Sequence, residues 1–333
     1  MLRIQFSEMV QAFVRVLLKM GFTQQRAETC AKLFAEASRD GVYTHGLNRF
    51  PRFIDYIKKG YIDVSAEPEK VAGFGAWERW DGKLGPGNLN AAFCMERAIT
   101  LAGENGLGCV AIKNTNHWMR GGSYGWQAVE AGCIGICWTN TGANMPAWGA
   151  KNCTLGNNPF IMAVPGLEGH VVLDMAMSQF SYGKMETSNT NQEMLPVDGG
   201  FDREGNLTRN PGAILEAGRP LPIGYWKGSG FSILLDLVVT ILSGGNSLAQ
   251  TKNFEAEYGV SQVFIAFDLS KLPDQGAIHQ AVIEIIANVH QAIPDHEGGK
   301  IYYPGERTLL TRGENLKNGI PVDEEIWQKV LAM

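Results

Sequence analysis

Residues 107–141, "LGCVAIKNTNHWMRGGSYGWQAVEAGCIGICWTNT", hold two apolar runs on either side of a short helical pattern. The runs "LGCVAIKNT" and "IGICWTNT" predict strands, and "YGWQAVEAG" between them predicts a short helix. "VAGFGAWERWDG" and "SQVFIAFDL" predict further strands, whereas "LGNNPFIMAVPG" and "HVVLDMAMS" alternate as paired antiparallel strands do. This order predicts a mixed α/β fold with a sheet-rich middle.

Helical patterns lie on both sides of the predicted strands. Ser7 and Thr23 each precede an amphipathic stretch, which predicts a capped helical hairpin, and Pro51 suits the first turn of a third helix beginning near Arg49. "NLNAAFCMERAITLAGENG", "QGAIHQAVIEIIANVHQA" and "DEEIWQKVLAM" also predict helices. "FSILLDLVVTILSGG" is apolar on nearly every side and predicts a buried helix. Residues 184–222 are rich in Gly, Pro and Asn and predict a long, functional loop excursion.

The composition restricts the class of protein. A hydrophobic content of 45%, 19% charged residues and a net charge of −5 indicate a soluble globular chain with no nucleic-acid partner. No run approaches the length of a membrane span, and the N-terminal segment lacks the pattern of a secretory signal, so no membrane association is expected. Six scattered cysteines predict free thiols and a cytoplasmic location, and the histidine spacing predicts no metal site.

The common cofactor and nucleophile motifs are incomplete. "GPGNLN" and "GSGFSI" lack the third glycine of the dinucleotide fingerprint, which makes a Rossmann fold improbable. "GGSYG" has the spacing of a nucleophile elbow at Ser123, but no strand precedes it, so a hydrolase is disfavoured.

Two histidines are the main catalytic candidates. His45 and Arg49 in "YTHGLNRFPRF" (43–53) are four residues apart and could share a helix face. Arginine binds carboxylates, and the ordinary pKa of histidine suits proton donation near neutral pH. His117 follows a strand end, where Asn116, Trp118 and Arg120 add hydrogen bonds, an aromatic wall and a cation. The alternatives are a solvated loop around His45 and a polar turn with a packed Trp118.

Two further candidates are weaker. Asp174 is a lone acid in an apolar strand, so we expect it to be buried and paired with a histidine or an arginine. Lys227 in "YWKGSG" could contact a phosphate, or it could be an ordinary loop lysine.

Together the segments "THG" with Arg49, "NHW", "GNNP", "DMAMS", "KGSG" and "PGE" resemble the type-2 malate/L-lactate dehydrogenase family. The segments occur in the same order over essentially the whole chain. This family comprises NAD(P)-dependent oxidoreductases that are unrelated to Rossmann dehydrogenases. The resemblance implies a large, mostly antiparallel sheet that binds the cofactor in residues 69–279. It also implies a helical domain from both termini, 1–68 plus 280–333, and a homodimer with active sites near the interface.

The resemblance also implies roles for individual residues. His45 would protonate the carbonyl oxygen during hydride transfer from NADH, and His117 would be the second active-site histidine. The implied cofactor contacts are His170, Val171, Val172, Leu173, Asp174, Met175, Ala176, Trp226, Lys227, Gly305, Glu306 and Arg307.

The substrate side of the site is an hypothesis built on this resemblance. Arg49 would bind the substrate carboxylate, His117 and Asn116 would polarise the ketone or bind hydroxyls, and Trp118 would wall the pocket. Asp174 would fix the orientation of a histidine. A keto sugar acid is the expected substrate, with oxaloacetate, pyruvate or a cyclic imino acid as alternatives. NADH is preferred over NADPH because no arginine cluster suits a 2′-phosphate. A non-catalytic binding protein is disfavoured because both the His/Arg pair and the cofactor segments are present.

Overall fold

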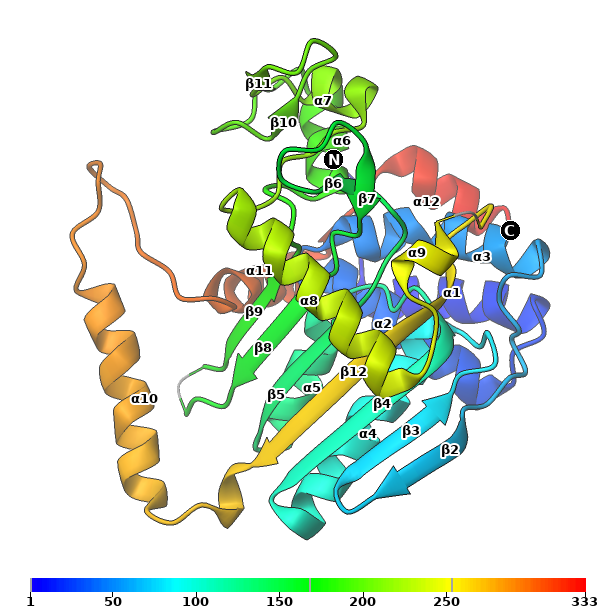
Figure 1. The fold of residues 1–333 in the computed structure, drawn as a ribbon, viewed down its shortest axis with the longest axis vertical. Helices are drawn as coiled ribbons and strands as arrows, with labels where there is room; N and C mark the ends of the chain where they lie inside the picture. The colour runs from blue at the N-terminus through cyan, green and yellow to red at the C-terminus, as the bar shows by residue number, and fades with distance from the viewer. Residues whose placement is uncertain (1, 168, 253) are drawn as a thin grey trace.

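The computed structural model describes residues 2–167, 169–252 and 254–333, and a seven-stranded sheet forms the centre of this described part (Figure 1). All neighbouring strands pair antiparallel except β3 and β4, which are parallel. The predicted mixed α/β fold with a mostly antiparallel sheet is therefore confirmed, and it differs from the parallel Rossmann sheet. In spatial order the strands are β2 (Glu69–Phe74), β3 (Trp77–Asp81), β4 (Leu107–Asn116), β12 (Tyr258–Asp268), β5 (Cys133–Thr139), β8 (Phe160–Val164) and β9 (Val171–Met175).

Helices cover both faces of this sheet. On β12, Phe264 packs with α4 (Gly87–Asn105) and α5 (Gly122–Glu130), whereas its neighbour Val263 packs with α8 (Trp226–Ser243) on the opposite face. Successive residues of a strand point to opposite faces, so one apolar strand serves two cores. In Figure 1, α8 crosses in front of the sheet while α4 and α5 lie behind it.

Segments from both ends of the chain pack together beside the sheet. They are α1 (Phe6–Lys19), α2 (Gln24–Arg39), α3 (Phe50–Lys58), α11 (Glu306–Asn318), α12 (Glu324–Leu331) and the paired strands β1 (Arg3–Ile4) and β13 (Ile320–Pro321). Thr23 occupies the N-cap position of α2 as predicted, but its side chain makes no capping hydrogen bond. The helix α1 begins at Phe6, with Gln5 and not Ser7 at its N-cap. The domain limits at residues 68 and 280 stay a prediction.

Two predicted segments form secondary structure other than that expected. "VAGFGAWERWDG" forms the hairpin β2–β3 and not one strand, because Gly75 takes a positive φ of 52° at the turn. Residues 184–222 are not a loop excursion. They contribute to α6 (Tyr182–Thr190), β10 (Gly200–Phe201), β11 (Leu207–Thr208) and α7 (Pro211–Ala217), which share a small core of Met185, Leu195 and Ile214. The few apolar residues in this polar segment are too widely spaced to give a periodic signal.

The helix α8 was predicted to be buried on all sides, but in the structure one side of it is exposed. Its inner side packs on the sheet, but Leu234, Leu237 and Ile241 on the outer side are 57%, 52% and 68% exposed. The helix α10 (Gln275–His290) projects from the body, and none of its residues is buried (Figure 1). Among the described residues, α8 alone is long and apolar enough to cross a membrane, contrary to the expectation from sequence. Core helices of globular proteins meet the same criterion, so this is weak evidence.

Short elements complete the described structure. They are the 3₁₀ turns η1 (Tyr43–His45), η2 (Leu47–Arg49) and η3 (Leu269–Lys271), the strands β6 (Met145–Pro146) and β7 (Cys153–Leu155), and the helix α9 (Leu248–Thr251).

Candidate active site

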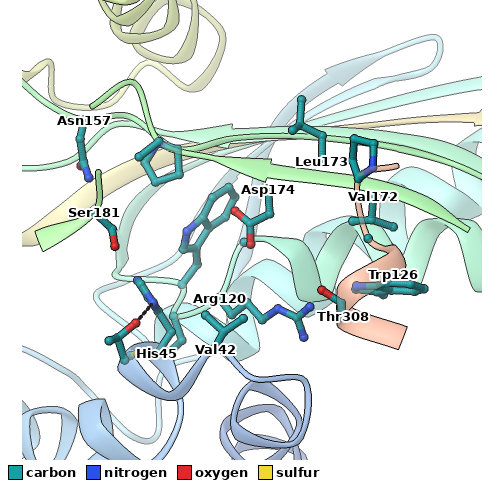
Figure 2. A pocket seen from close by; sticks show the side chains of 18 of the residues that line it. Val42, His45, Arg120, Trp126, Asn157, Val172, Leu173, Asp174, Ser181 and Thr308 are labelled. Carbon is teal, nitrogen blue, oxygen red and sulfur yellow. Dashed lines mark hydrogen bonds between the residues drawn. The ribbon is translucent and has the colours of Figure 1, made fainter. Parts of the chain in front are cut away.

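A cavity of about 400 Å³ lies where η1, the β4–α5 loop, β9 and the start of α11 meet (Figure 2). His45, His117, Arg120 and Asp174 are the titratable side chains that line it. The other lining residues are Val42, Thr44, Trp118, Met119, Gly121, Trp126, Asn157, Pro159, Val172, Leu173, Ala176, Ser181, Pro304, Gly305 and Thr308. The structure therefore brings together both predicted catalytic histidines and much of the predicted cofactor segment.

His45 is held by the turn that follows α2. Gly46 lies so close to α2 that an added Cβ would meet Ser38 Oγ at 2.1 Å, so only glycine fits there. This turn places His45 Nδ1 at 3.0 Å from Thr44 Oγ1 and stacks the His45 ring on that of His117, with centroids 5.8 Å apart. Nε2, the opposite ring nitrogen of His45, has no hydrogen-bond partner among the described residues and is available to a ligand.

Arg49 does not share a helix face with His45. The two residues lie in separate 3₁₀ turns, η1 and η2, because the backbone at Gly46 leaves the helical region. Arg49 lines a smaller adjoining cavity with Asn116 and His117 and does not line the main one. The predicted joint helix face is therefore wrong, while carboxylate binding by Arg49 stays a prediction.

His45 does not keep the ordinary pKa of histidine. Burial is the largest influence and, with the positive charges of Arg49 and Arg120, it lowers the pKa of His45 to about 4, although Asp174 acts to raise it. Without a ligand, the ring is therefore neutral at pH 7. A bound anion would raise this pKa and favour the proton-donating form.

His117 is a neutral hydrogen-bond donor. Its Nδ1 accepts a hydrogen bond of 2.9 Å from the Met119 backbone N–H, so the ring proton lies on Nε2. Burial and the nearby cation Arg49 lower the pKa of His117 well below its usual value. Nε2 lies 4.0 Å from Glu257 Oε1, a carboxylate that also accepts a hydrogen bond from the Gly142 N–H.

The neighbours of His117 are largely committed to the fold. Asn116 donates its amide to the backbone carbonyls of Tyr61, Leu84 and Gly85, while its buried Oδ1 has no partner among the described residues. Trp118 is 1% exposed and packs edge to face on Phe264. The packed-tryptophan alternative therefore describes this ring well, and substrate contact by either residue stays a prediction.

Asp174 is exposed and, within the part of the chain that the structure describes, forms no ion pair with a histidine or an arginine. Its carboxylate is exposed, and Oδ2 accepts a 2.8 Å hydrogen bond from the Gly122 N–H at the start of α5. A side chain at Gly122 would collide with this carboxylate, so the glycine permits the contact. The sequence missed this arrangement because β9 is an edge strand and faces the cavity.

The predicted cofactor segments divide between the cavity and its surroundings. Val172, Leu173, Asp174, Ala176 and Gly305 line the cavity. Gly305, with a φ of 96°, allows the start of α11 to approach the β9 backbone, where the Val172 N–H donates to the Pro304 carbonyl at 2.8 Å. The residues outside the cavity are His170, Val171, Met175, Trp226, Lys227, Glu306 and Arg307, whose contacts with a cofactor stay a prediction.

A buried charge cluster behind the cavity was not predicted. Asp40 accepts hydrogen bonds from Arg39 at 2.7 Å, from Arg120 at 2.5 Å and from Arg312 at 2.8 and 2.7 Å. Burial raises the pKa of Asp40, but these three arginines outweigh it and lower the pKa to about 2. The cluster ties α2 to α11 and to the cavity wall. Sequence reasoning had no signal for it, because its members lie up to 272 residues apart.

Two neutral histidines beside a strand that exposes one carboxylate define an enzyme site suited to proton transfer, on an antiparallel fold that is not of the Rossmann type. The sequence model of the malate/L-lactate dehydrogenase family matches residues 4–331. The chain belongs to this family of oxidoreductases.

Individual relatives agree with this assignment. The chain is 47% identical over 336 residues to a 2,3-diketo-L-gulonate reductase of Escherichia coli O127:H6 and 49% identical over 334 residues to one of Citrobacter koseri, with all of each chain covered. The sulfolactate dehydrogenase of Methanocaldococcus jannaschii has a similar structure, with a TM-score of 0.90 at 28% identity over 99% of this chain and 95% of the other.

Proposed function

We propose that the chain is an NADH-dependent reductase of 2,3-diketo-L-gulonate that forms 3-keto-L-gulonate by reduction of the 2-keto group. The proposal is carried by the stacked pair of His45 and His117 at one end of a cavity that β9 and Gly305 also line. The full-length likeness to 2,3-diketo-L-gulonate reductases supports the choice of substrate.

The residues of the cavity fit the proposed roles. NADH supplies the hydride when bound, and Val172, Asp174, Ala176 and Gly305 would hold it along β9. His45 donates a proton from its free ring nitrogen to the carbonyl oxygen. His117 donates a hydrogen bond from Nε2 to the same oxygen or to a hydroxyl group of the substrate.

Arg49 and Glu257 complete the proposed substrate side. Arg49 binds the substrate carboxylate from the adjoining cavity, where it lies beside His117. The Met119 N–H fixes the orientation of His117 through Nδ1, and Glu257 Oε1 lies 4.0 Å from His117 Nε2, too far for a hydrogen bond, so that Nε2 stays open to the substrate.

A substrate panel tests the function. The purified protein is mixed with NADH or NADPH and with 2,3-diketo-L-gulonate, oxaloacetate, pyruvate or a cyclic imino acid, and the loss of reduced nicotinamide absorbance is followed. We expect the highest kcat/KM with diketogulonate and NADH. A higher kcat/KM with a simple 2-oxo acid would contradict the sugar-acid assignment and leave the family assignment intact.

The low pKa of His45 predicts an acid-favoured reduction. Because the folded pKa of about 4 lies below the ordinary value, the free enzyme carries the protonated ring only at acidic pH. The kcat/KM for keto reduction should therefore rise about tenfold for each pH unit between pH 8 and pH 5. Oxidation of the hydroxy acid, in which the neutral ring accepts a proton, should not show this rise.

Saturation with substrate provides the internal control for this pH prediction. A bound carboxylate raises the pKa of His45, so kcat should level off at a higher pH than kcat/KM. A kcat/KM for reduction that is constant from pH 5 to pH 8 would contradict the assignment of His45 as the donor.

A homodimer and a cytoplasmic location belong to the same proposal. A second copy would cover the exposed apolar sides of α8 and α10, whose Ile241 and Ile285 are 68% and 65% exposed. All six cysteines are free, which suits a reducing compartment.

A further inference from the structure

Two buried N–H groups on the cavity wall have no hydrogen-bond partner among the described residues. They are Nε of Arg120 and Nε1 of Trp126, on side chains whose residues are 5% and 4% exposed. Both residues line the cavity; in Figure 2 Trp126 lies beside Thr308 at one end, and the Arg120 side chain extends toward Thr308 from near Val42. Both also line a second cavity, together with Asp40 and Arg312. Buried donors are normally paired, so two unpaired donors at one end of a cavity indicate a ligand that accepts hydrogen bonds.

The backbone at this end favours a negatively charged ligand. The helix α11 begins at the cavity, since Gly305, which precedes it, lines the wall, whereas the start of α5 already holds the Asp174 carboxylate on the Gly122 N–H. The helix dipole and the first backbone N–H groups make a helix N-terminus a favourable place for phosphate oxygens.

The side-chain charges agree with the backbone. Arg120 belongs to the cluster in which three arginines face Asp40, and Glu36 pairs with Arg39 at 3.3 Å, so three positive charges meet two carboxylates. Asp174 is the one carboxylate among the residues that line the cavity, and the Gly122 N–H already bonds its Oδ2. His45, at the other end, is neutral at pH 7.

We infer that Arg120 Nε and Trp126 Nε1 bind the diphosphate oxygens of the dinucleotide, beside the N-terminus of α11. This inference rests on the proposed function, which places the nicotinamide end of the cofactor beside His45. The diphosphate then lies farther along β9, toward Val172 and Gly305, where the two free donors are. A substrate carboxylate is a poorer candidate, because the carbonyl beside it must reach the histidines.

Trp126→Phe is the variant that isolates one of these donors. Phenylalanine keeps an aromatic ring against His170 and under Arg312, which lies 4.5 Å from the Trp126 ring centre, and it removes only the N–H and part of the ring. Trp77→Phe is the matched control, because Nε1 of Trp77 is also buried and unpaired among the described residues but lies in β3, outside the cavity. Arg120→Lys keeps the charge beside Asp40 and removes the Nε donor.

Calorimetric titration with NADH and with ADP-ribose gives the decisive readout. ADP-ribose carries the diphosphate but no nicotinamide, so its binding is independent of catalysis. We expect Trp126→Phe and Arg120→Lys to weaken both ligands about tenfold or more, because each loses a hydrogen bond to a charged group. Trp77→Phe should bind both ligands as the wild type does, and KM for the keto acid at saturating NADH should stay unchanged in every variant.

Different outcomes overturn different claims. If the wild type binds ADP-ribose and both cavity variants bind it equally tightly, the donors do not serve the diphosphate. If KM for the keto acid rises while ADP-ribose affinity is unchanged, the donors serve the substrate and the inference is wrong. A wild type that binds neither NADH nor ADP-ribose overturns the proposed cofactor and the inference together. Binding of both without turnover of any keto acid overturns the proposed function and leaves the inference supported.

Discussion

Replacing His45 with alanine is expected to lower kcat for keto reduction by a factor of about a hundred to ten thousand, the usual contribution of a positioned proton donor. The affinity for NADH should change little, because the residues proposed to hold the cofactor, such as Val172, Ala176 and Gly305, lie on other elements and keep their contacts without the His45 ring. The rise of kcat/KM toward acidic pH should also disappear with the imidazole. Steady-state kinetics and NADH titration measure these three effects.

Two further variants test whether the loss is specific to His45. His296→Ala removes a side chain that is 74% exposed and lies outside the cavity, so its kinetics should match those of the wild type. His117→Gln keeps an N–H donor and should retain the acid-favoured pH dependence while kcat falls. A His45→Ala enzyme with near-normal kcat would show that another group donates the proton.

The fold was largely predictable because its strands carry local signals. The alternation in "LGNNPFIMAVPG" and "HVVLDMAMS" predicted the β8–β9 pair, and the runs on either side of "YGWQAVEAG" correctly predicted β4 and β5. The insertion of β12 between β4 and β5 was not predictable, because the pairing joins segments more than 120 residues apart. No local pattern encodes which strands become neighbours.

The candidate site was predictable only in part, for a related reason. His45 and His117 stood out because each sits in a polar, glycine-containing stretch, and the structure brings their rings together. The four-residue spacing predicted that His45 and Arg49 share one helix face, which is wrong. Gly46 ends the first 3₁₀ turn, so the two residues lie in separate turns. Arg120 stood out beside His117, but Glu257 reaches the site through tertiary contacts, and nothing in its own segment distinguishes it from a surface charge.

Loss of the carboxylate at Asp40 should have the largest effect on stability. Its side chain is 1% exposed and faces three guanidinium groups, of which that of Arg120 is 5% exposed. Asp40→Asn leaves Arg120 and Arg312 without a carboxylate partner among the described residues, while Arg39 keeps Glu36, and the free energy of unfolding at pH 7 should fall by about 3–5 kcal/mol. The exposed pair Asp55–Lys59 provides the matched control, because Asp55→Asn should cost no more than about 1 kcal/mol. Chemical denaturation of both variants gives the comparison.

The free energy of unfolding of the wild type minus that of Asp40→Asn should depend on pH if the effect is electrostatic. The pKa of Asp40 is about 2 in the folded protein and about 4 in an unfolded chain. A depressed folded pKa stabilises the protein above the unfolded value, and this stability is lost as pH falls from about 4 to about 2. The difference in free energy of unfolding between wild type and Asp40→Asn should therefore be constant near neutral pH and become smaller as the pH falls from about 4 to about 2. A gap that stays below about 1 kcal/mol at pH 7 would mean that the arginines are satisfied without Asp40, and that the cluster does not hold α11 against the cavity wall.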